Sequence, residues 1–307
     1  MILQVGGAVR ALVTGLVDYA GLFPPAALDM STAVANYAHY RASDDAWMLG
    51  RFVVPVSRLD EWSAAVGTLT AAERSAWSGA RLSALLSGEF SREAEQISAF
   101  NAAEPFGVRI DVAEGRTATP DAVLATAAAM PDDVLLYCEL PHREDPLALL
   151  QAVKSAHVRA KIRTGGVTRD AFPTPHEIIR FLRRCVETGV TAKATAGLHH
   201  PLRGEYRLTY APDAVRGTMY GYLNVFLAAA AVRAGASDDE AVVILLATDP
   251  ASLAFASDGV VVAGISVSAS AVAEARRSSV VAFGSCSFLE PVEELGALLA
   301  GSARVSA

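Results

Sequence analysis

The chain has 307 residues, of which 52% are hydrophobic and 19% charged, and its formal net charge at pH 7 is -7. This size and apolar content suit one large folded core, and the negative charge without a Lys/Arg cluster argues against a nucleic-acid partner. The longest apolar run, residues 223–232, is too short to cross a bilayer, so we expect no membrane partner either.

Strand-like and helix-like segments alternate along the whole chain. The expected strands cover residues 16–20, 51–56, 81–86, 108–112, 134–139, 158–163, 191–194 and 280–283. The expected helices begin at Ser31 and near Thr119, and they cover residues 59–66, 91–102, 146–155, 174–187 and 291–299. Eight strand–helix pairs in a largely hydrophobic chain predict an α/β fold, a (β/α)₈ TIM barrel that residues 1–307 form as a single domain.

The chain is longer than the usual barrel of about 250 residues. We assign the excess to an insertion between strands seven and eight, residues 198–279, with a loop (198–217), a helix (218–234) and a helical and hairpin-like part (238–268). The helix is apolar around much of its circumference, so either the insertion covers it or it forms a homo-oligomer interface. A doubly wound open sheet is the alternative fold, but no Gly-x-Gly-x-x-Gly follows the first strand. We expect no cofactor.

The cysteines bear on the compartment. Cys138, Cys185 and Cys286 are far apart and odd in number, without the spacing of a metal site. Reduced thiols in a cytoplasmic protein are the simplest interpretation. The apolar N-terminal segment lacks a basic region and is followed at once by Asp18, so we expect no signal peptide.

Two lysines lie in short strand-like segments that each end in glycine, Lys161 before Gly165 and Lys193 before Gly197. The capped helix between them completes a strand, crossover helix, strand unit, which places both amines side by side at one end of a parallel sheet. Burial disfavours an ammonium, and so does a neighbouring ammonium, so this pair could yield a neutral lysine nucleophile for carbonyl substrates. The structural alternative is two ammoniums, each paired with a carboxylate such as Glu139 or Asp111.

In such barrels the chemistry lies at the C-terminal ends of the strands. Further polar residues expected there are Asp18, Asp111, Glu139 and Arg163 in strands and His199, His200 and Arg203 in the following loop. Asp18 and Asp111 could equally cap a turn or pair with an arginine, whereas Glu139, flanked by apolar residues, favours function.

Two loops add to the expected pocket. Gly284, Ser285, Cys286 and Ser287 follow the last strand, where glycine and serine offer N–H groups and hydroxyls for an anion; the alternative is a tight turn with a capping serine. A nucleophilic Cys286 is disfavoured, because spacing alone places no histidine beside it. Residues 18–26, dense in turn and aromatic residues, predict a hydrophobic lip on the pocket, with a barrel-bottom plug as the alternative.

These residues resemble the core of the 2-deoxyribose-5-phosphate aldolases, which have a Lys-x-x-Thr-Gly strand, a helix that begins near Thr-Pro, and a Lys-x-x-Gly-Gly strand. The similar segments are residues 17–18, 109–112, 136–139, 161–165, 174–175, 193–197 and 283–287. The resemblance implies that Lys161 forms a Schiff base and that Lys193 lowers its pKa. It also implies that Asp111 relays a proton through water and that residues 285–287 hold the anionic group of the substrate.

The departures from that family concern the substrate. Thr164 and Gly197 keep the family pattern and are expected to bind substrate, but Ala196 stands in place of the first glycine of the strand-seven pair. Arg163 replaces a small hydroxyl residue, and the insertion has no counterpart. With His199, His200 and Arg203, Arg163 could recognise a carboxylate or another acidic group.

Three functions follow as hypotheses. The leading one is a class I, aldolase-like lyase in which Lys161 attacks a small anionic carbonyl compound, Asp111 or Glu139 moves protons, and Lys193 keeps Lys161 deprotonated. The second is a metal-assisted hydrolase or isomerase with Glu139, His199 and His200 around a divalent ion. The third is a non-catalytic barrel that binds a small molecule.

Overall fold

In the computed structural model, which describes residues 7–305, eight parallel strands close into a barrel in the order β1-β13-β7-β6-β5-β4-β3-β2. These strands are β1 (Val17–Tyr19), β2 (Leu49–Pro55), β3 (Arg81–Leu85), β4 (Arg109–Arg116), β5 (Leu135–Leu140), β6 (Arg159–Arg163), β7 (Ala192–Thr195) and β13 (Val280–Ser285). The predicted (β/α)₈ TIM barrel is therefore confirmed.

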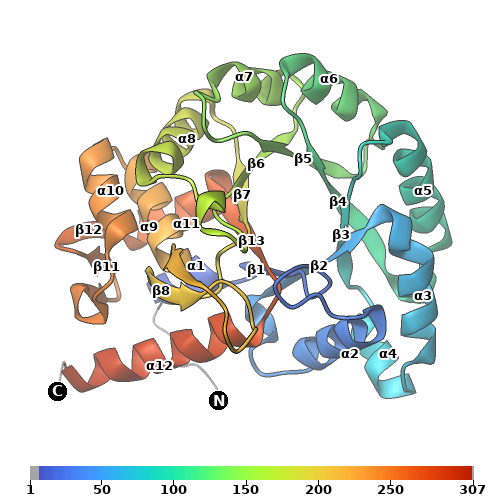
Figure 1. Cartoon of the computed structure of the whole chain (residues 1–307), viewed down its shortest axis with the longest axis horizontal. Coiled ribbons are helices and arrows are strands. Elements are labelled where there is room, and N and C mark those ends of the chain that lie inside the picture. The colour runs from blue at the N-terminus through green and yellow to red at the C-terminus, as the bar shows by residue number, and fades with distance from the viewer. Residues whose placement is uncertain (1–6, 306–307) are drawn as a thin grey trace.

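Helices surround the strands, as Figure 1 shows. They are α1 (Gly7–Val13), α2 (Met30–Arg41), α3 (Leu59–Thr68), α4 (Ala71–Trp77), α5 (Phe90–Ala103), α6 (Pro120–Ala129), α7 (Leu147–Ser155), α8 (Pro175–Thr188), α9 (Tyr222–Arg233), α10 (Asp238–Leu246), α11 (Ala269–Ser278) and α12 (Leu289–Val305). Within residues 7–305, no helix combines the length and apolar character needed to cross a membrane.

The crossover helix α8 places the two lysine strands side by side. Its N-terminus is a capping box, in which the Thr174 hydroxyl accepts from the Glu177 backbone N–H and the Glu177 carboxylate accepts from that of Thr174. Its C-terminus is closed by Gly189 in the left-handed conformation. β6 and β7 consequently pair in a register that sets Lys161 opposite Lys193, as the strand–helix–strand pattern predicts.

The insertion between β7 and β13 contains one helix that packs in the outer ring of the barrel and further elements that lie beyond that ring. Its helix α9 is buried along its whole length except at Arg233, and it packs against α8, α10 and α11. A three-stranded antiparallel sheet, β10 (Leu253–Phe255), β11 (Gly259–Val262) and β12 (Ile265–Ser268), follows α10, in agreement with the predicted hairpin-like part. The apolar surface of α9 is thus covered within the chain and gives no reason to expect an oligomer.

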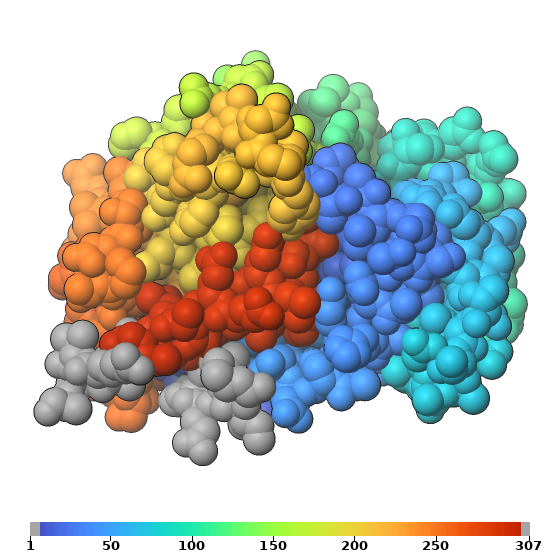
Figure 2. Space-filling model, turned by 60° about the horizontal axis from the view of Figure 1, so that its bottom comes forward, coloured from blue at the N-terminus to red at the C-terminus, as the bar shows by residue number. Residues whose placement is uncertain are grey.

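The loop that precedes α9 contains a hairpin that the sequence did not predict. Strands β8 (Gly204–Arg207) and β9 (Arg216–Met219) pair antiparallel. In Figure 2 the hairpin lies next to the first turns of α12, and the Tyr210 hydroxyl donates to the Glu290 carboxylate there.

Candidate active site

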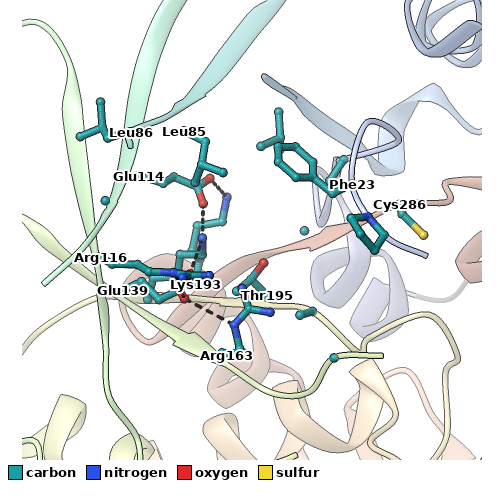
Figure 3. Close-up of a pocket in the computed structure, with 18 of the residues that line it drawn as sticks. Phe23, Leu85, Leu86, Glu114, Arg116, Glu139, Arg163, Lys193, Thr195 and Cys286 are labelled. Atoms are coloured by element: carbon teal, nitrogen blue, oxygen red, sulfur yellow. Dashed lines mark hydrogen bonds and ion pairs between the residues drawn. The ribbon is translucent and has the colours of Figure 1, made fainter. Parts of the chain in front are cut away.

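A cavity of about 560 Å³ lies at the C-terminal end of the barrel. Its floor is formed by side chains from β4, β5, β6 and β7, namely Glu114, Glu139, Lys161 and Lys193. Figure 3 shows Glu114, Glu139 and Lys193 among them. Ala20, Phe23, Pro24 and Pro25 from the loop after β1 line one side of it. The predicted hydrophobic lip is therefore confirmed.

The two lysine side chains are buried and share one carboxylate. Lys161 Nζ lies 2.7 Å from Glu114 Oε2 and 2.9 Å from Glu139 Oε2. Lys193 Nζ lies 2.6 Å from Glu114 Oε1 and 2.5 Å from Asp18 Oδ2. Glu114, which sequence reasoning missed, thus stands between the two amines and offsets their mutual repulsion.

The pKa values of this cluster follow from its charges. Burial raises the pKa of Glu114, but the ammoniums of Lys161 and Lys193 outweigh burial and hold that pKa well below its usual value. Burial lowers the pKa of Lys193, but Asp18 and Glu114 outweigh it and raise that pKa. Lys193 therefore remains charged at neutral pH, and its pKa is not depressed by its lysine neighbour as the sequence had led us to expect.

Arginine side chains stand at the mouth of the cavity. Arg163 Nε lies 3.4 Å and Arg116 Nε 3.3 Å from Glu139 Oε1. Lys161, Arg163 and Arg116 lower the pKa of Glu139, although burial opposes them. Because both arginines are partly or largely exposed, they can bind the anionic group of an incoming molecule.

The opposite wall of the cavity carries His199 and Cys286. His199 Nδ1 lies 3.9 Å from Cys286 Sγ and 3.3 Å from Glu290 Oε2. The spacing in the sequence gave no sign of this contact, because nearly the whole insertion separates the two residues along the chain.

The expected position of Asp111 in the pocket is wrong. Asp111 does not line the cavity, and its carboxylate forms an ion pair with Arg51 through two hydrogen bonds of 2.7 and 2.8 Å. The reason is a bulge in β4: Leu82 pairs with Ile110 but Ser83 pairs with Val112, so Asp111 is an extra residue. Glu114 then faces the cavity in its place.

Other residues expected at the substrate lie outside the cavity lining. The Thr164 hydroxyl donates to the carbonyl of Ala196 at 2.8 Å, so it ties β6 to the end of β7. His200 Nδ1 lies 2.8 Å from Glu294, and its ring stacks on Tyr206.

Arg203, Ser285 and Ser287, which were also expected to bind substrate, lie outside the cavity lining and form hydrogen bonds elsewhere. The backbone N–H of Arg203 donates to Asn224. Ser285 and Ser287 organise the turn into α12, where the Ser285 hydroxyl accepts from the Ser287 N–H and the Ser287 hydroxyl from the Glu290 N–H. Of this set, Arg163, Gly197, His199, Gly284 and Cys286 do line the cavity.

The ligand set of the metal hypothesis is not assembled. Glu139 is held among Lys161 and the arginines, whereas His200 faces Glu294. Within residues 7–305, no group of three or more His, Cys, Asp and Glu side chains is arranged to hold a metal ion.

Protein-family models, curated protein sequences and solved structures were compared with this chain, and none of them matches it.

Proposed function

We propose that this protein is a Schiff-base lyase of the aldolase type, which acts on a small carbonyl compound that carries an anionic group. The observation that carries the proposal is the pair of buried amines at the floor of one cavity, held on adjacent strands and joined through Glu114. A buried amine in a cavity large enough for a small molecule is the arrangement that iminium formation requires.

Lys161 is the better candidate for the nucleophile. Lys193 is held by Asp18 and Glu114 and lies over the ring of Tyr137, 5.5 Å from its centroid, and each of these contacts favours a cation. The second partner of Lys161 is Glu139, whose charge is also shared by Arg163. Lys193 therefore has more contacts that favour a cation than Lys161 has, and we assign the role of nucleophile to Lys161.

The proposed chemistry uses the carboxylates in turn. Lys161 transfers a proton to Glu139, 2.9 Å away, and the free amine attacks the substrate carbonyl. Glu139 returns this proton to the departing hydroxyl, so that water and an iminium form. The iminium accepts the electron pair of the carbon–carbon bond that breaks, while the hydroxyl group of the leaving fragment becomes a carbonyl and gives its proton to Glu139. Lys193 holds Glu114 as a carboxylate beside the reacting nitrogen, so that the iminium is paired as the ammonium was.

The test is reductive trapping with a panel of small aldehydes, ketones and 2-keto acids plus borohydride, followed by peptide mass spectrometry. Lys161→Arg and Lys193→Arg are the matched variants, because arginine keeps the positive charge but is not a nucleophile at neutral pH. We expect an adduct on Lys161 in the wild type and in Lys193→Arg, and none in Lys161→Arg. Absence of any adduct, or an adduct on Lys193 alone, would contradict the proposal.

We further propose that the protein acts in the cytoplasm. Its cysteines Cys138, Cys185 and Cys286 are all free and buried, which suits a reducing compartment.

A further inference from the structure

A second group of reactive side chains lies across the cavity from the lysines. In Figure 3 Cys286 stands beside Phe23, on the far side of the cavity from Glu114 and Lys193. Cys286 and His199 both line the cavity, although they are only 5% and 7% exposed. A small molecule that enters the cavity therefore meets a thiol as well as the amines.

The thiol is surrounded by groups that can take or give a proton. His199 Nδ1 lies 3.9 Å from Cys286 Sγ, 3.4 Å from Ser285 Oγ and 3.3 Å from Glu290 Oε2. The Tyr210 hydroxyl, which donates to Glu290 at 2.9 Å, is also 3.6 Å from Cys286 Sγ. The histidine is thus held in place beside the sulfur by a carboxylate.

His199 carries a positive charge at neutral pH. Burial lowers its pKa, but Cys286 and Glu290 outweigh burial and raise the pKa to about 9. Reactive cysteines lie in electropositive surroundings, such as beside a charged histidine. Burial raises the pKa of the other two thiols, that of Cys138 to about 11.

We propose that Cys286, paired with His199, is a second nucleophile of this cavity, which adds to the aldehyde group of a small molecule to form a hemithioacetal. The Sγ–carbon bond forms as the carbonyl π bond opens, and the carbonyl oxygen takes the proton of the His199 imidazolium. The step needs no leaving group and no oxidant, and its reversal returns the thiolate, the imidazolium and the aldehyde. This inference goes beyond the lysine chemistry and does not depend on it.

The first experiment compares the three cysteines of the intact protein by their rates of alkylation with iodoacetamide, followed by peptide mass spectrometry between pH 6 and 9. The groups that face Cys286 or interact with it electrostatically are His199, Tyr210 and Tyr19, and Glu290 contacts both His199 and Tyr210. We expect Cys286 to react at pH 7 at least about tenfold faster than Cys138 and Cys185. His199→Gln should slow the alkylation of Cys286 by about tenfold, because glutamine places no positive charge beside the sulfur.

The second experiment asks whether an aldehyde reaches the thiol. Glycolaldehyde should protect Cys286 from iodoacetamide in the wild type and equally in Lys161→Arg, which cannot form an iminium at that position. Protection that disappears in Lys161→Arg would place the aldehyde on the lysine, overturning the thiol proposal while supporting the lyase. A Cys286 that is alkylated no faster than Cys138 and Cys185 would also overturn it, whatever the lysine does.

Discussion

At the scale of single residues, Glu114 controls the site because it balances two buried cations at once. Each of its oxygens lies within 2.7 Å of a lysine nitrogen, and Oε1 also accepts from the Ser83 hydroxyl. Removal of one partner from a buried ion pair leaves an uncompensated charge, which costs far more than an exposed pair contributes.

Glu114→Gln should therefore lower the free energy of unfolding by about 3 kcal/mol at pH 7. Because the pKa of Glu114 is lowered in the folded protein, its contribution is fully present above pH 4.5 and is lost as the pH falls below that value. The difference between wild type and variant should thus be constant near neutral pH and shrink in acid. Urea unfolding from pH 3 to 8 measures it, with the exposed Glu95→Gln as control; an equal gap at pH 3 and pH 7 would contradict the assignment.

A second residue-scale prediction concerns the anionic group of the substrate. Arg163→Met removes a guanidinium at the mouth of the cavity, and a hydrogen bond to a charged group contributes about 1.5–3 kcal/mol. Reductive trapping of a 2-keto acid should then fall at least about tenfold, while trapping of the corresponding neutral ketone stays close to that of wild type. The exposed Arg92→Met provides the control, and equal losses for both compounds would assign Arg163 a structural role.

The residue scale is also where prediction from sequence met its limit. The two lysines could be placed as neighbours, because a strand, a capped helix and a second strand leave little choice of geometry. Glu114 could not be placed in the site from the sequence. If side chains along β4 alternate regularly from Ile110, Asp111 points into the barrel and Glu114 points out of it. The bulge at Asp111 reverses which side chains of β4 face the barrel interior, and no residue pattern in this sequence indicates a bulge there.

At the scale of elements, the end of β7 carries backbone strain next to the substrate cavity. Ala196 and Gly197 both adopt left-handed conformations, with φ of 62° and 72°. An added Cβ on Gly197 would lie 2.9 Å from Gly165 Cα and 3.0 Å from the Phe172 ring, so the β6 and β7 loops touch there. The left-handed conformation costs alanine free energy because its Cβ crowds the backbone, whereas glycine has no Cβ and adopts it without that cost.

Ala196→Gly should consequently raise the free energy of unfolding by about 0.5–1 kcal/mol, since the relief of about 1–2 kcal/mol exceeds the added freedom of glycine in the unfolded chain. Gly197→Ala, one residue later, should lower it by about 2 kcal/mol, because strain and a backbone clash add together. Chemical unfolding of the two variants side by side tests this. Changes of the same sign would show that left-handed backbone is not what distinguishes the two positions.

Some elements of the insertion could be predicted from the sequence and others could not, for a physical reason. The α9 helix was expected from its apolar residues, and the part after it was expected to be helical and hairpin-like, but neither the third strand of the β10–β11–β12 sheet nor the β8–β9 hairpin was predicted. Its strands have four residues each, and exposed charged residues such as Glu205 and Arg207 interrupt any apolar face. A hairpin that is held by its neighbours, not by its own pattern, gives little signal in the sequence.

At the scale of the whole molecule, we expect the insertion and the barrel to unfold as one unit, because α9 of the insertion packs against α8 of the barrel. Asn224 on α9 is fully buried, accepts from the Arg203 N–H at 2.8 Å and donates to the carbonyls of Ile244 and Ala247 at 2.8 and 2.9 Å. The Asn224 side chain therefore joins the loop after β7, α9 and the end of α10, which are three parts of the insertion.

Asn224→Ala should lower the free energy of unfolding by about 3 kcal/mol, since it leaves three backbone groups without partners. Trp62 and Trp77 pack against each other on α3 and α4, elements far from α9 in the chain, so their fluorescence reports on another part of the barrel. A cooperative molecule predicts that the tryptophan transition shifts to lower urea as far as the circular dichroism transition does. A tryptophan transition that stays in place would mean that the insertion unfolds separately.

The cluster of Asp18, Glu114 and Glu139 around two amines has a consequence for any intermediate that forms there. Carboxylates arranged to hold an ammonium at Lys161 hold whatever cation replaces it at the same nitrogen, and a protonated imine carries the same charge. Conversion of the ammonium to an iminium, with release of water, therefore leaves the net charge of the barrel interior unchanged once Glu139 has given up the proton that it takes from Lys161. The carboxylates that stabilise the covalent intermediate are therefore already in place in the folded protein before any substrate binds.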